Sequence, residues 1–468
     1  MNTFNKKSLF VALAATGALG AGAAQAVSVN PDGLGQVLIY PYYTTQSVLN
    51  SPWNSLLSVV NTTGSTKAVK IRFREGKASA EVLDFNIFLS PQDVWTGAIV
   101  PTPGGAGASL FSSDKSCTIP TIPSTGVAFR DLAYKNDPIG GGLERTKEGY
   151  VEILEMATYT DGSVVATNSK HSSGVPKDCS KVTDSVAASE AQTPQGGLSG
   201  GITLVNVLGG LDVTADAVAL ANWRDASIYS TTGDLTPSLG DAVPFTSLST
   251  NAQGNTVYAT WTNGAEAVSG ALMKRSVANE FVLDTATLST TSLVITFPTK
   301  HLFVDDVVAL PPFQNELGEN GACDAVGATD YNREEAKRTI GGPDFSPSPT
   351  PEGTSICWEA NVVAMGGADA LGSANEYTVG TVFQNGWVDI VFGSAPGVSP
   401  TWIPQLVAQS ATSFVNGVAS GASTTFTGLP VVGFAMQTFT NGFLTDPSGS
   451  LVQSTYGGSF VHKYRAAQ

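Results

Sequence analysis

Hydrophobic residues recur at every second position in several short runs of this chain. In the run 68–75, three apolar residues alternate with three cations in the order VKIRFR. A period of two places successive side chains on opposite faces of a strand. This run therefore predicts a strand with one apolar face and one cationic face.

Two neighbouring runs extend this pattern. Residues 56–60 precede the strand and residues 83–89 follow it, and both are apolar or alternating. The segment 61–64 (NTTG) predicts a turn between the first two runs. Pro91 and Trp95 are expected to end the unit. Together these features predict a meander of three antiparallel strands, the building unit of a β-sandwich.

Further strand-like runs cover the rest of the chain. They lie at 149–156, 202–207, 213–223, 293–297, 302–304, 386–392, 430–439 and 458–463. Between them, 102–119 reads as a long loop, and 161–197 and 315–359 as polar insertions, the first with a short helix near 182–191. The prediction is an all-β fold: an antiparallel β-sandwich, Ig-like or jelly-roll-like, with long disulfide-closed insertions.

The first residues have the pattern of a secretory signal peptide. Lys6 and Lys7 precede an uncharged apolar run, and Ala24-Gln25-Ala26 supplies small residues before the expected cleavage point. The strongly apolar part, 9–19, is too short to cross a bilayer. We therefore expect residues 1–26 to be a signal peptide of a Gram-negative exported protein. Elsewhere no apolar run exceeds about ten residues, so no membrane span is expected in the mature chain.

The chain after residue 26 is longer than one small sandwich needs. We expect a first β-sandwich domain over residues 27–197, with an insertion. A second β-rich domain is expected over residues 198–468, with its insertion near 315–359.

Composition narrows the classes of partner. The chain has 24 basic and 39 acidic residues, a net charge of −15. Such a charge repels nucleic acid, which we do not expect as a partner. Charged residues are only 13% of the chain, against about 25% in ordinary soluble domains. With 50 glycines and 25 prolines, the profile favours short strands and turns and is typical of surface-layer and secreted adhesive proteins.

The cysteines predict disulfides. Four residues allow three pairings, and the spacing favours Cys117 with Cys179 and Cys323 with Cys357, because each pair brackets a polar insertion. Disulfides also fit an exported protein. A zinc site would need clustered ligands, and neither the cysteines nor the histidines cluster in sequence.

The cationic face of 68–75 is the most distinctive candidate for binding. The interaction stripe consists of Lys67, Lys70, Arg72, Arg74 and Lys77. It could dock an acidic face of another copy or an anionic surface polysaccharide. The alternative, which we favour, is a solvated face paired across the hairpin with Glu81 and Asp84.

Candidate chemistry is sparse. The segment 197–201 (GLSGG) matches Gly-x-Ser-x-Gly, but a nucleophile elbow needs a strand before Ser199 and a helix after it, and here a loop precedes a strand. We expect no enzymatic activity and no cofactor. Calcium is the exception, because acidic loops supply hard oxygen ligands. Its candidate ligands are Asp324, Asp330, Glu334 and Glu335.

Several stretches carry a family resemblance. They include 35–43 (GQVLIYPYY), 93–96 (DVWT) and 297–301 (FPTKH), together with the turn and strand end around 60–76. In these the chain resembles exported proteobacterial β-rich proteins known only as cell-surface proteins. The resemblance implies a surface or secreted location and supplies no catalytic residues.

Three functional hypotheses follow. The first is an exported cell-surface structural or adhesive protein, self-assembling into a layer, filament or matrix with itself or other surface components as partners. The second is a secreted or periplasmic binding module for carbohydrate or another ligand. The third and weakest is an exported hydrolase.

Overall fold

The structure, a computed structural model, describes residues 26–48, 50–249, 256–337, 354–393, 402–415, 418–445 and 447–467. The expected signal peptide therefore lies outside the described residues, apart from Ala26. Strands dominate and pair mostly antiparallel, which confirms the prediction of an all-β, sandwich-like fold. Of the helices in the described ranges, none has the length and apolarity that crossing a bilayer requires.

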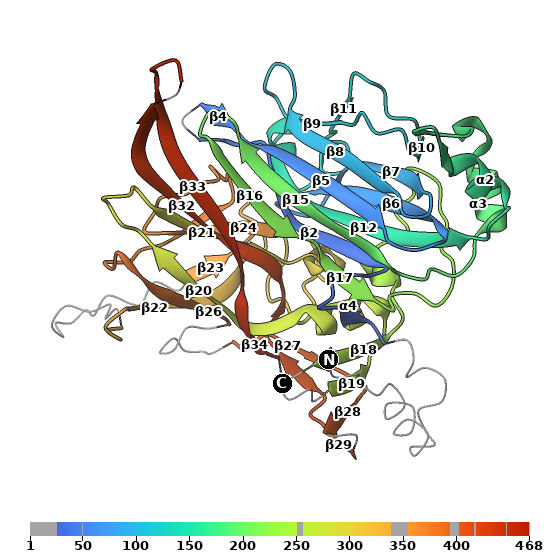
Figure 1. The fold of residues 1–468 in the computed structure, drawn as a ribbon. Coiled ribbons are helices and arrows are strands. Elements are labelled where there is room, and N and C mark those ends of the chain that lie inside the picture. Colours follow the sequence, from blue (N-terminus) through green and yellow to red (C-terminus); the bar gives the residue numbers. More distant parts are fainter. Residues whose placement is uncertain are drawn as a thin grey trace, which may run out of the picture.

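Two antiparallel sheets form the N-terminal sandwich (Figure 1). The first has the order β1-β17-β2-β12-β6-β7-β10, with bounds Ser28–Val29, Val218–Ala221, Val37–Thr44, Glu148–Tyr159, Thr66–Glu75, Glu81–Leu89 and Cys117–Ile119. The second has the order β11-β9-β8-β5-β15-β16, with bounds Val127–Ala128, Ala108–Phe111, Val94–Pro101, Asn54–Asn61, Leu198–Asn206 and Leu211–Asp216. The short strands β3 (Ser47–Val48) and β4 (Ser51–Pro52) form a separate pair.

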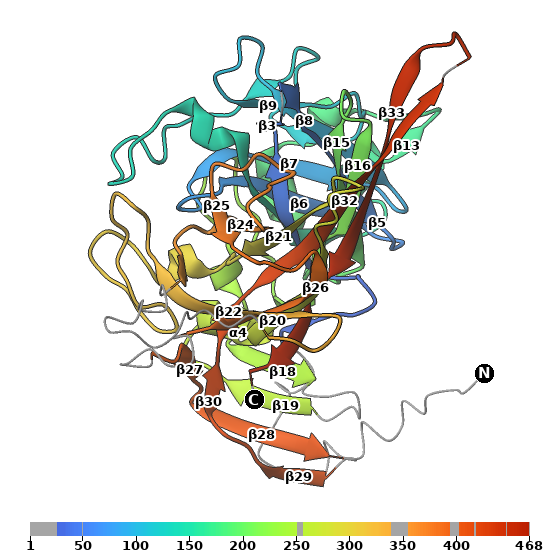
Figure 2. The same ribbon diagram turned by 90° about the vertical axis from the view of Figure 1, so that its left-hand side faces the viewer.

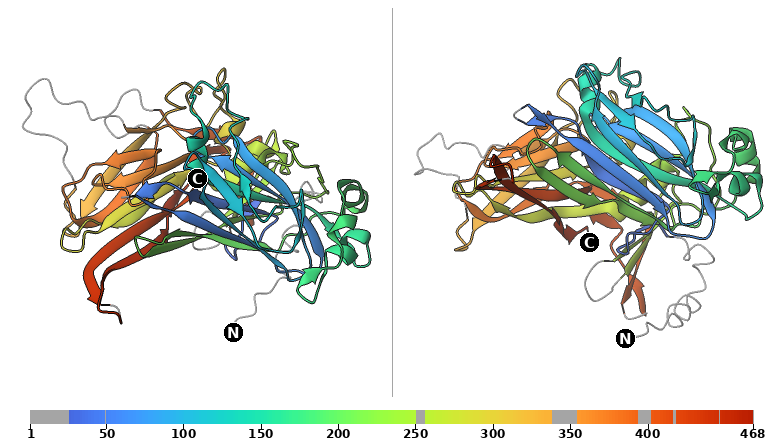
Figure 3. Two further views of the ribbon diagram at one scale, coloured as in Figure 1. Left: turned by 90° about the horizontal axis from the view of Figure 1, so that it is seen from above. Right: turned by 45° about the horizontal axis from the view of Figure 1, so that its top comes forward.

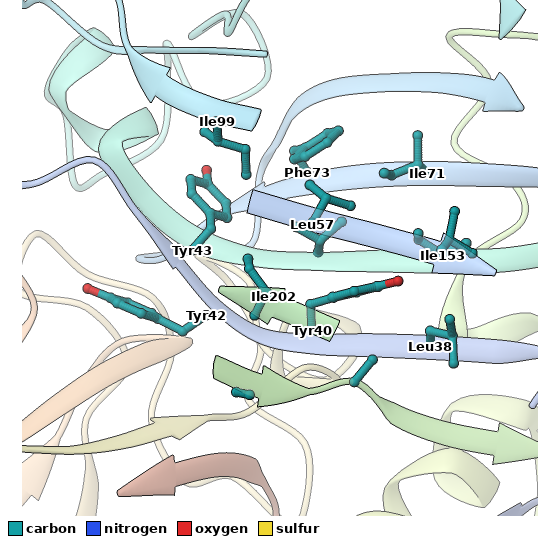
Figure 4. Packing of buried hydrophobic residues seen from close by; sticks show 14 of the residues in the cluster. Leu38, Tyr40, Tyr42, Tyr43, Leu57, Ile71, Phe73, Ile99, Ile153 and Ile202 are labelled. Carbon is teal, nitrogen blue, oxygen red and sulfur yellow. The ribbon is translucent and has the colours of Figure 1, made fainter. Parts of the chain in front are cut away.

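The core lies between these sheets. Figure 4 shows Tyr40 and Phe73 of the first sheet in the same cluster as Leu57 and Ile202 of the second. All are at most 2% exposed, and burying each such side chain stabilises the fold by about 1.5–3 kcal/mol. The apolar face predicted for 68–75 is thus part of the core.

The predicted meander is wrong in one respect. β6 and β7 form the expected hairpin, but β5 pairs with β8 and β15 in the opposite sheet. The Asn61 side chain donates to the carbonyls of Ser65, Leu89 and Ser90. These bonds hold the turn after β5 as a connection between the sheets. Trp95 lies within β8 and is buried, so it does not end the unit.

The C-terminal half adds two larger sheets. One has the order β23-β22-β26-β20-β31, with β34 also pairing with β20, and bounds Thr354–Ile356, Asp324–Asn332, Asn385–Phe392, Met273–Val282, Leu429–Pro430 and Lys463–Ala466. The other has the order β25-β24-β21-β32-β33, with bounds Glu376–Val379, Ala360–Met365, Thr290–Thr296, Val432–Thr445 and Leu451–Val461. Both contribute to a second core that contains Phe281, Val388 and Leu293.

A smaller sheet lies at one end of the molecule (Figure 2). Its order is β18-β19-β28-β29, with bounds Phe245–Ser249, Thr256–Thr260, Ser410–Val415 and Val418–Gly421. Helix α4 (Gly264–Leu272) packs against β18, and β27 (Gln405–Val407) pairs with β30 (Thr425–Thr427).

The two halves share one interior. Val294 and Phe434 of the C-terminal half belong to the first core cluster. Thr296 Oγ1 donates to the Pro41 carbonyl at 2.6 Å, across the two halves. The strands β15, β16 and β17 follow residue 197 yet belong to the N-terminal sandwich, so strand pairing changes only after Ala221. The expected domain boundary at 197 does not coincide with that change.

The insertions differ in character. The first contains helices α2 (Val164–Ser169) and α3 (Asp184–Glu190), and α3 confirms the helix predicted near 182–191. The second is no simple loop, because β22 lies within it and pairs with β26 along seven residues. The expected strand at 302–304 is wrong: Lys300–Leu302 forms a 3-10 helix instead.

Candidate interaction surface

The interaction stripe predicted from sequence lies inside the protein. Lys67, Lys70 and Arg72 are at most 1% exposed, and Arg74 is 6% exposed. Only Lys77 is partly exposed, and its ammonium lies 4.5 Å from the centre of the Trp358 ring. The stripe is therefore neither a docking surface nor a solvated face. Alternation revealed a cationic face of β6 but not what covers it.

Each buried cation has an acidic partner. The ion pairs join Lys67 to Glu155 at 2.6 Å, Lys70 to Asp84 at 3.4 Å, Arg72 to Glu81 at 2.5 Å and Arg74 to Glu152 at 3.3 Å. The expected partners Glu81 and Asp84 are thus confirmed. Two further partners come from β12, the strand beside β6, which sequence spacing could not reveal.

A loop of the chain covers the middle of this face. Lys70 Nζ donates to the carbonyls of Thr231, Asp234 and Thr236. Arg72 Nη1 donates to the carbonyl of Pro237 at 2.8 Å. Burial lowers the pKa of Lys70. The cations thus hold the irregular segment 231–237 by its backbone carbonyl oxygens, and their role is structural.

A buried carboxyl lies where the two halves meet. Glu359 is 4% exposed, and its Oε2 has no hydrogen-bond partner among the described residues. Burial raises its pKa to about 8, although Lys300 and Ser79 favour the ionised form. The carboxyl is accordingly protonated in the folded protein at neutral pH.

The titration of Glu359 predicts a pH dependence of stability. The folded protein retains a proton that the unfolded chain releases near pH 4.5, so stability falls as pH rises from about 4.5 to about 8. The slope from this group approaches about 1.4 kcal/mol per pH unit. Glu359→Gln should flatten the curve over that window, as measured by urea unfolding at several pH values. Parallel curves for the two proteins would contradict the assignment.

Both predicted disulfides are present. Cys117 bonds to Cys179 and Cys323 to Cys357. The first joins the edge strand β10 to the insertion that carries α2 and α3, and the second lies beside the pairing of β22 with β23. Two disulfides point to an oxidising, exported environment.

The calcium candidates do not converge. Asp324 is buried and binds Lys300 at 2.8 Å. Asp330 lies six positions further along the same strand and accepts a hydrogen bond from Thr381, so the two α-carbons are about 20 Å apart. Glu334 and Glu335 are exposed beyond the end of the strand. The described residues contain no group of three or more His, Cys, Asp or Glu that could hold a metal ion.

Ser199 and the histidines lie in separate structural settings. Ser199 is inside β15 and pairs with Val60, so it does not lie at a strand-to-helix turn of the kind that a nucleophile elbow requires.

The structure also brings together Ser90, Asp93 and His171, a grouping that the sequence did not reveal. Ser90 Oγ and Asp93 Oδ2 both approach Nδ1 of His171, at 3.3 and 3.5 Å, and Ser90 also donates to Asp93. A catalytic triad needs the two ring nitrogens to face different partners, so this grouping stabilises a turn.

The hairpin of β32 and β33 projects from the fold. It extends beyond the rest of the fold in Figure 2 and in the left view of Figure 3. At its base it lies against β16, where Ser459 donates to the Thr214 carbonyl and Gly457 lies close to the Leu211 side chain. Residues 451–456 continue past this contact.

β33 is an edge strand with apolar side chains in solvent. Its paired strand is β32, and the opposite edge has no paired strand in the described part of the chain. Leu451 is 71% exposed and Tyr456 54% exposed. The segment 451–461 (LVQSTYGGSFV) contains no charged residue. The sequence predicted a closing strand at 458–463, but not that its N-terminal continuation would project.

Comparisons of the chain with models of protein families, with curated proteins and with solved structures give no match. The resemblance to exported cell-surface proteins therefore stays a prediction. The projecting edge of β33 is the best supported candidate for an interaction surface.

Proposed function

We propose that this chain is an exported cell-surface structural or adhesive protein that assembles with copies of itself through the edge of β33. The observation that carries the proposal is the open, uncharged edge at 451–456. Unpaired N–H and C=O groups on an edge strand are a template for another strand. Protective features common on such edges are charged side chains and proline, and this segment contains neither.

A second uncharged edge supports growth beyond a pair. β29 is the outer strand of the small sheet, and its Val418 is 68% exposed. Figure 2 places β29 at the opposite end of the molecule from the β32–β33 hairpin. Pairing of β33 in one copy with β29 in the next would be heterologous, and such contacts extend into open filaments or rings.

The charge of the chain favours these two edges over other surfaces as contacts. Without residues 1–26, which include Lys6 and Lys7 and no acidic residue, each copy has 22 basic and 39 acidic residues, a net charge of −17. Copies therefore repel one another unless they meet at neutral segments. Raising ionic strength screens that repulsion over a Debye length of about 8 Å near physiological salt. Assembly should therefore strengthen with salt.

Sedimentation velocity over a range of protein and salt concentrations tests the proposal. The chain without residues 1–26 should assemble as concentration rises, and Leu451→Lys with Tyr456→Lys should raise the required concentration about tenfold or more, because edge lysines oppose strand pairing. Val307→Lys is the matched control, since Val307 is 69% exposed but lies outside the strands.

Two outcomes would contradict assembly through β33. Either the wild-type protein stays monomeric at every concentration, or the lysine variant assembles as the wild type does.

Protease shaving of intact cells tests the location of the protein. Release of peptides from this chain while periplasmic controls stay protected supports the surface assignment. Protection until the outer membrane is opened would favour the periplasmic binding module instead.

A further inference from the structure

A different exposed feature lies on the outer face of the sheet that contains β22, β26 and β20. Val388 and Ile390 of β26 point into the second core. Because side chains alternate along a strand, Trp387 and Asp389 point to the opposite face. Trp387 lies opposite Tyr331 on β22 and opposite Glu280 on β20.

Exposed Trp387 stacks on partly buried Tyr331. Their ring centres are 4.7 Å apart and their planes differ by 12°. Trp387 keeps 38% of its surface exposed although it lies within a sheet. Aromatic rings combine a large apolar surface with an electron-rich face. That combination suits the C–H groups of a sugar ring, which are apolar and weakly electropositive.

A carboxylate with unused hydrogen-bonding capacity lies beside this pair. Asp389 is 7% exposed, and its Oδ2 binds Arg465 at 2.9 Å. Its Oδ1 is buried and has no hydrogen-bond partner in the described ranges of the chain. Buried polar atoms are normally satisfied, so this oxygen points to an acceptor site for a ligand donor. Arg465, whose side chain is 66% exposed, offers further donors.

The spacing matches one sugar unit. Trp387 and Asp389 are two residues apart on one strand, a separation of about 7 Å. A pyranose ring packed on the indole can therefore place a hydroxyl near Asp389. Across β20 from Asp389 lies the small residue Ala278, which leaves the guanidinium of Arg465 able to reach the carboxylate.

We propose that this outer face is a binding site for neutral saccharides. The acidic residues Glu280 and Asp389 share this face with Lys463 and Arg465, and Lys337 lies opposite Tyr331, so acidic residues are not in excess there. The chain as a whole has a net charge of −15, which opposes acidic polysaccharides. The site lies apart from the projecting segment 451–456, and it adds ligand binding to the proposed assembly.

Isothermal titration calorimetry with cellohexaose, maltohexaose, mannohexaose and, as an acidic probe, a galacturonic acid hexamer tests this site. The wild-type chain should bind at least one neutral hexasaccharide. Trp387→Ala should weaken that binding about tenfold or more, because the stacking surface is removed. Asp389→Asn, which keeps an oxygen at Oδ1 but loses the charge, should weaken it less.

Leu132→Ala is the control, because Leu132 is 68% exposed in the N-terminal half, outside both proposed surfaces, and its replacement should leave saccharide binding unchanged. Circular dichroism and thermal unfolding of each variant separate a lost site from a lost fold. The proposal is overturned if no neutral hexasaccharide binds, if the acidic hexamer binds more tightly, or if a folded Trp387→Ala variant binds as the wild type does. Failure of the β33 lysine variant to alter assembly leaves this test unaffected.

Discussion

Replacing Lys67 with methionine is expected to lower the free energy of unfolding by about 3–5 kcal/mol at neutral pH. Lys67 and Glu155 are both fully buried, and their charged atoms are 2.6 Å apart. Without the ammonium, the carboxylate of Glu155 would keep only the amides of Gln195 and Gly196 as partners. Removing one member of a buried pair leaves an uncompensated charge, which is the origin of the large effect.

The pH dependence of this variant offers a second readout. Burial already raises the pKa of Glu155, and Lys67 opposes that rise. Without Lys67 the pKa rises further, so folding of the variant takes up a proton. Its stability should therefore fall more steeply than that of the wild type as pH increases. Urea unfolding at pH 5 and pH 8 measures the difference.

Lys181→Met is the matched control for Lys67→Met. Lys181 pairs with Asp178 at 3.5 Å, but their side chains are 62% and 36% exposed. Solvent screens an exposed pair of this kind, so its removal should change the stability little. A further variant, Lys67→Met with Glu155→Gln, should recover part of the lost stability because no buried charge remains. Equal small losses in Lys67→Met and Lys181→Met would show that the buried pair does not support the fold.

Removing the disulfide between Cys117 and Cys179 should destabilise the protein by about 4 kcal/mol in the chain-entropy description. The two residues are 62 positions apart, so the bond restricts a long loop of the unfolded chain. Both cysteines belong to or pack against a buried cluster with Val165 and Ala187 of the two helices. The double variant Cys117→Ala/Cys179→Ala, compared with the wild type by denaturant unfolding, measures the effect.

This loss should also have a local signature. Limited proteolysis of the double variant should cut first within 160–195, because that insertion loses its covalent link to β10. Replacing Cys323 and Cys357 instead, a pair 34 positions apart, should leave 160–195 as resistant as in the wild type. Unchanged stability and an unchanged cleavage pattern after removal of Cys117 and Cys179 would contradict this account.

The sequence by itself determined the fold class and several strands. Alternation of VKIRFR placed β6, and similar patterns placed β7, β12 and β26, because a strand with one face in the core leaves a period of two in its residues. The sequence also predicted the cysteine pairing correctly. Each disulfide closes a polar segment, and closing such a segment reduces the conformational freedom of the unfolded chain. The strands depend on residues close together in the chain, and the pairing of the cysteines depends on the length and polarity of the segment between them.

Only the tertiary structure decided which sheet each strand joins and what lies over its second face. β5 and β6 are neighbours in sequence, yet they lie in opposite sheets, and β12 lies between β2 and β6. The cations of β6 are buried because acids of β12 and carbonyls of 231–237 meet them there. The alternation of apolar and charged residues indicates that a strand has two different faces, but the residues that pack against each face come from distant segments of the chain. The projecting edge of β33 and the outward Trp387 arise in the same way, because exposure depends on where the rest of the chain packs.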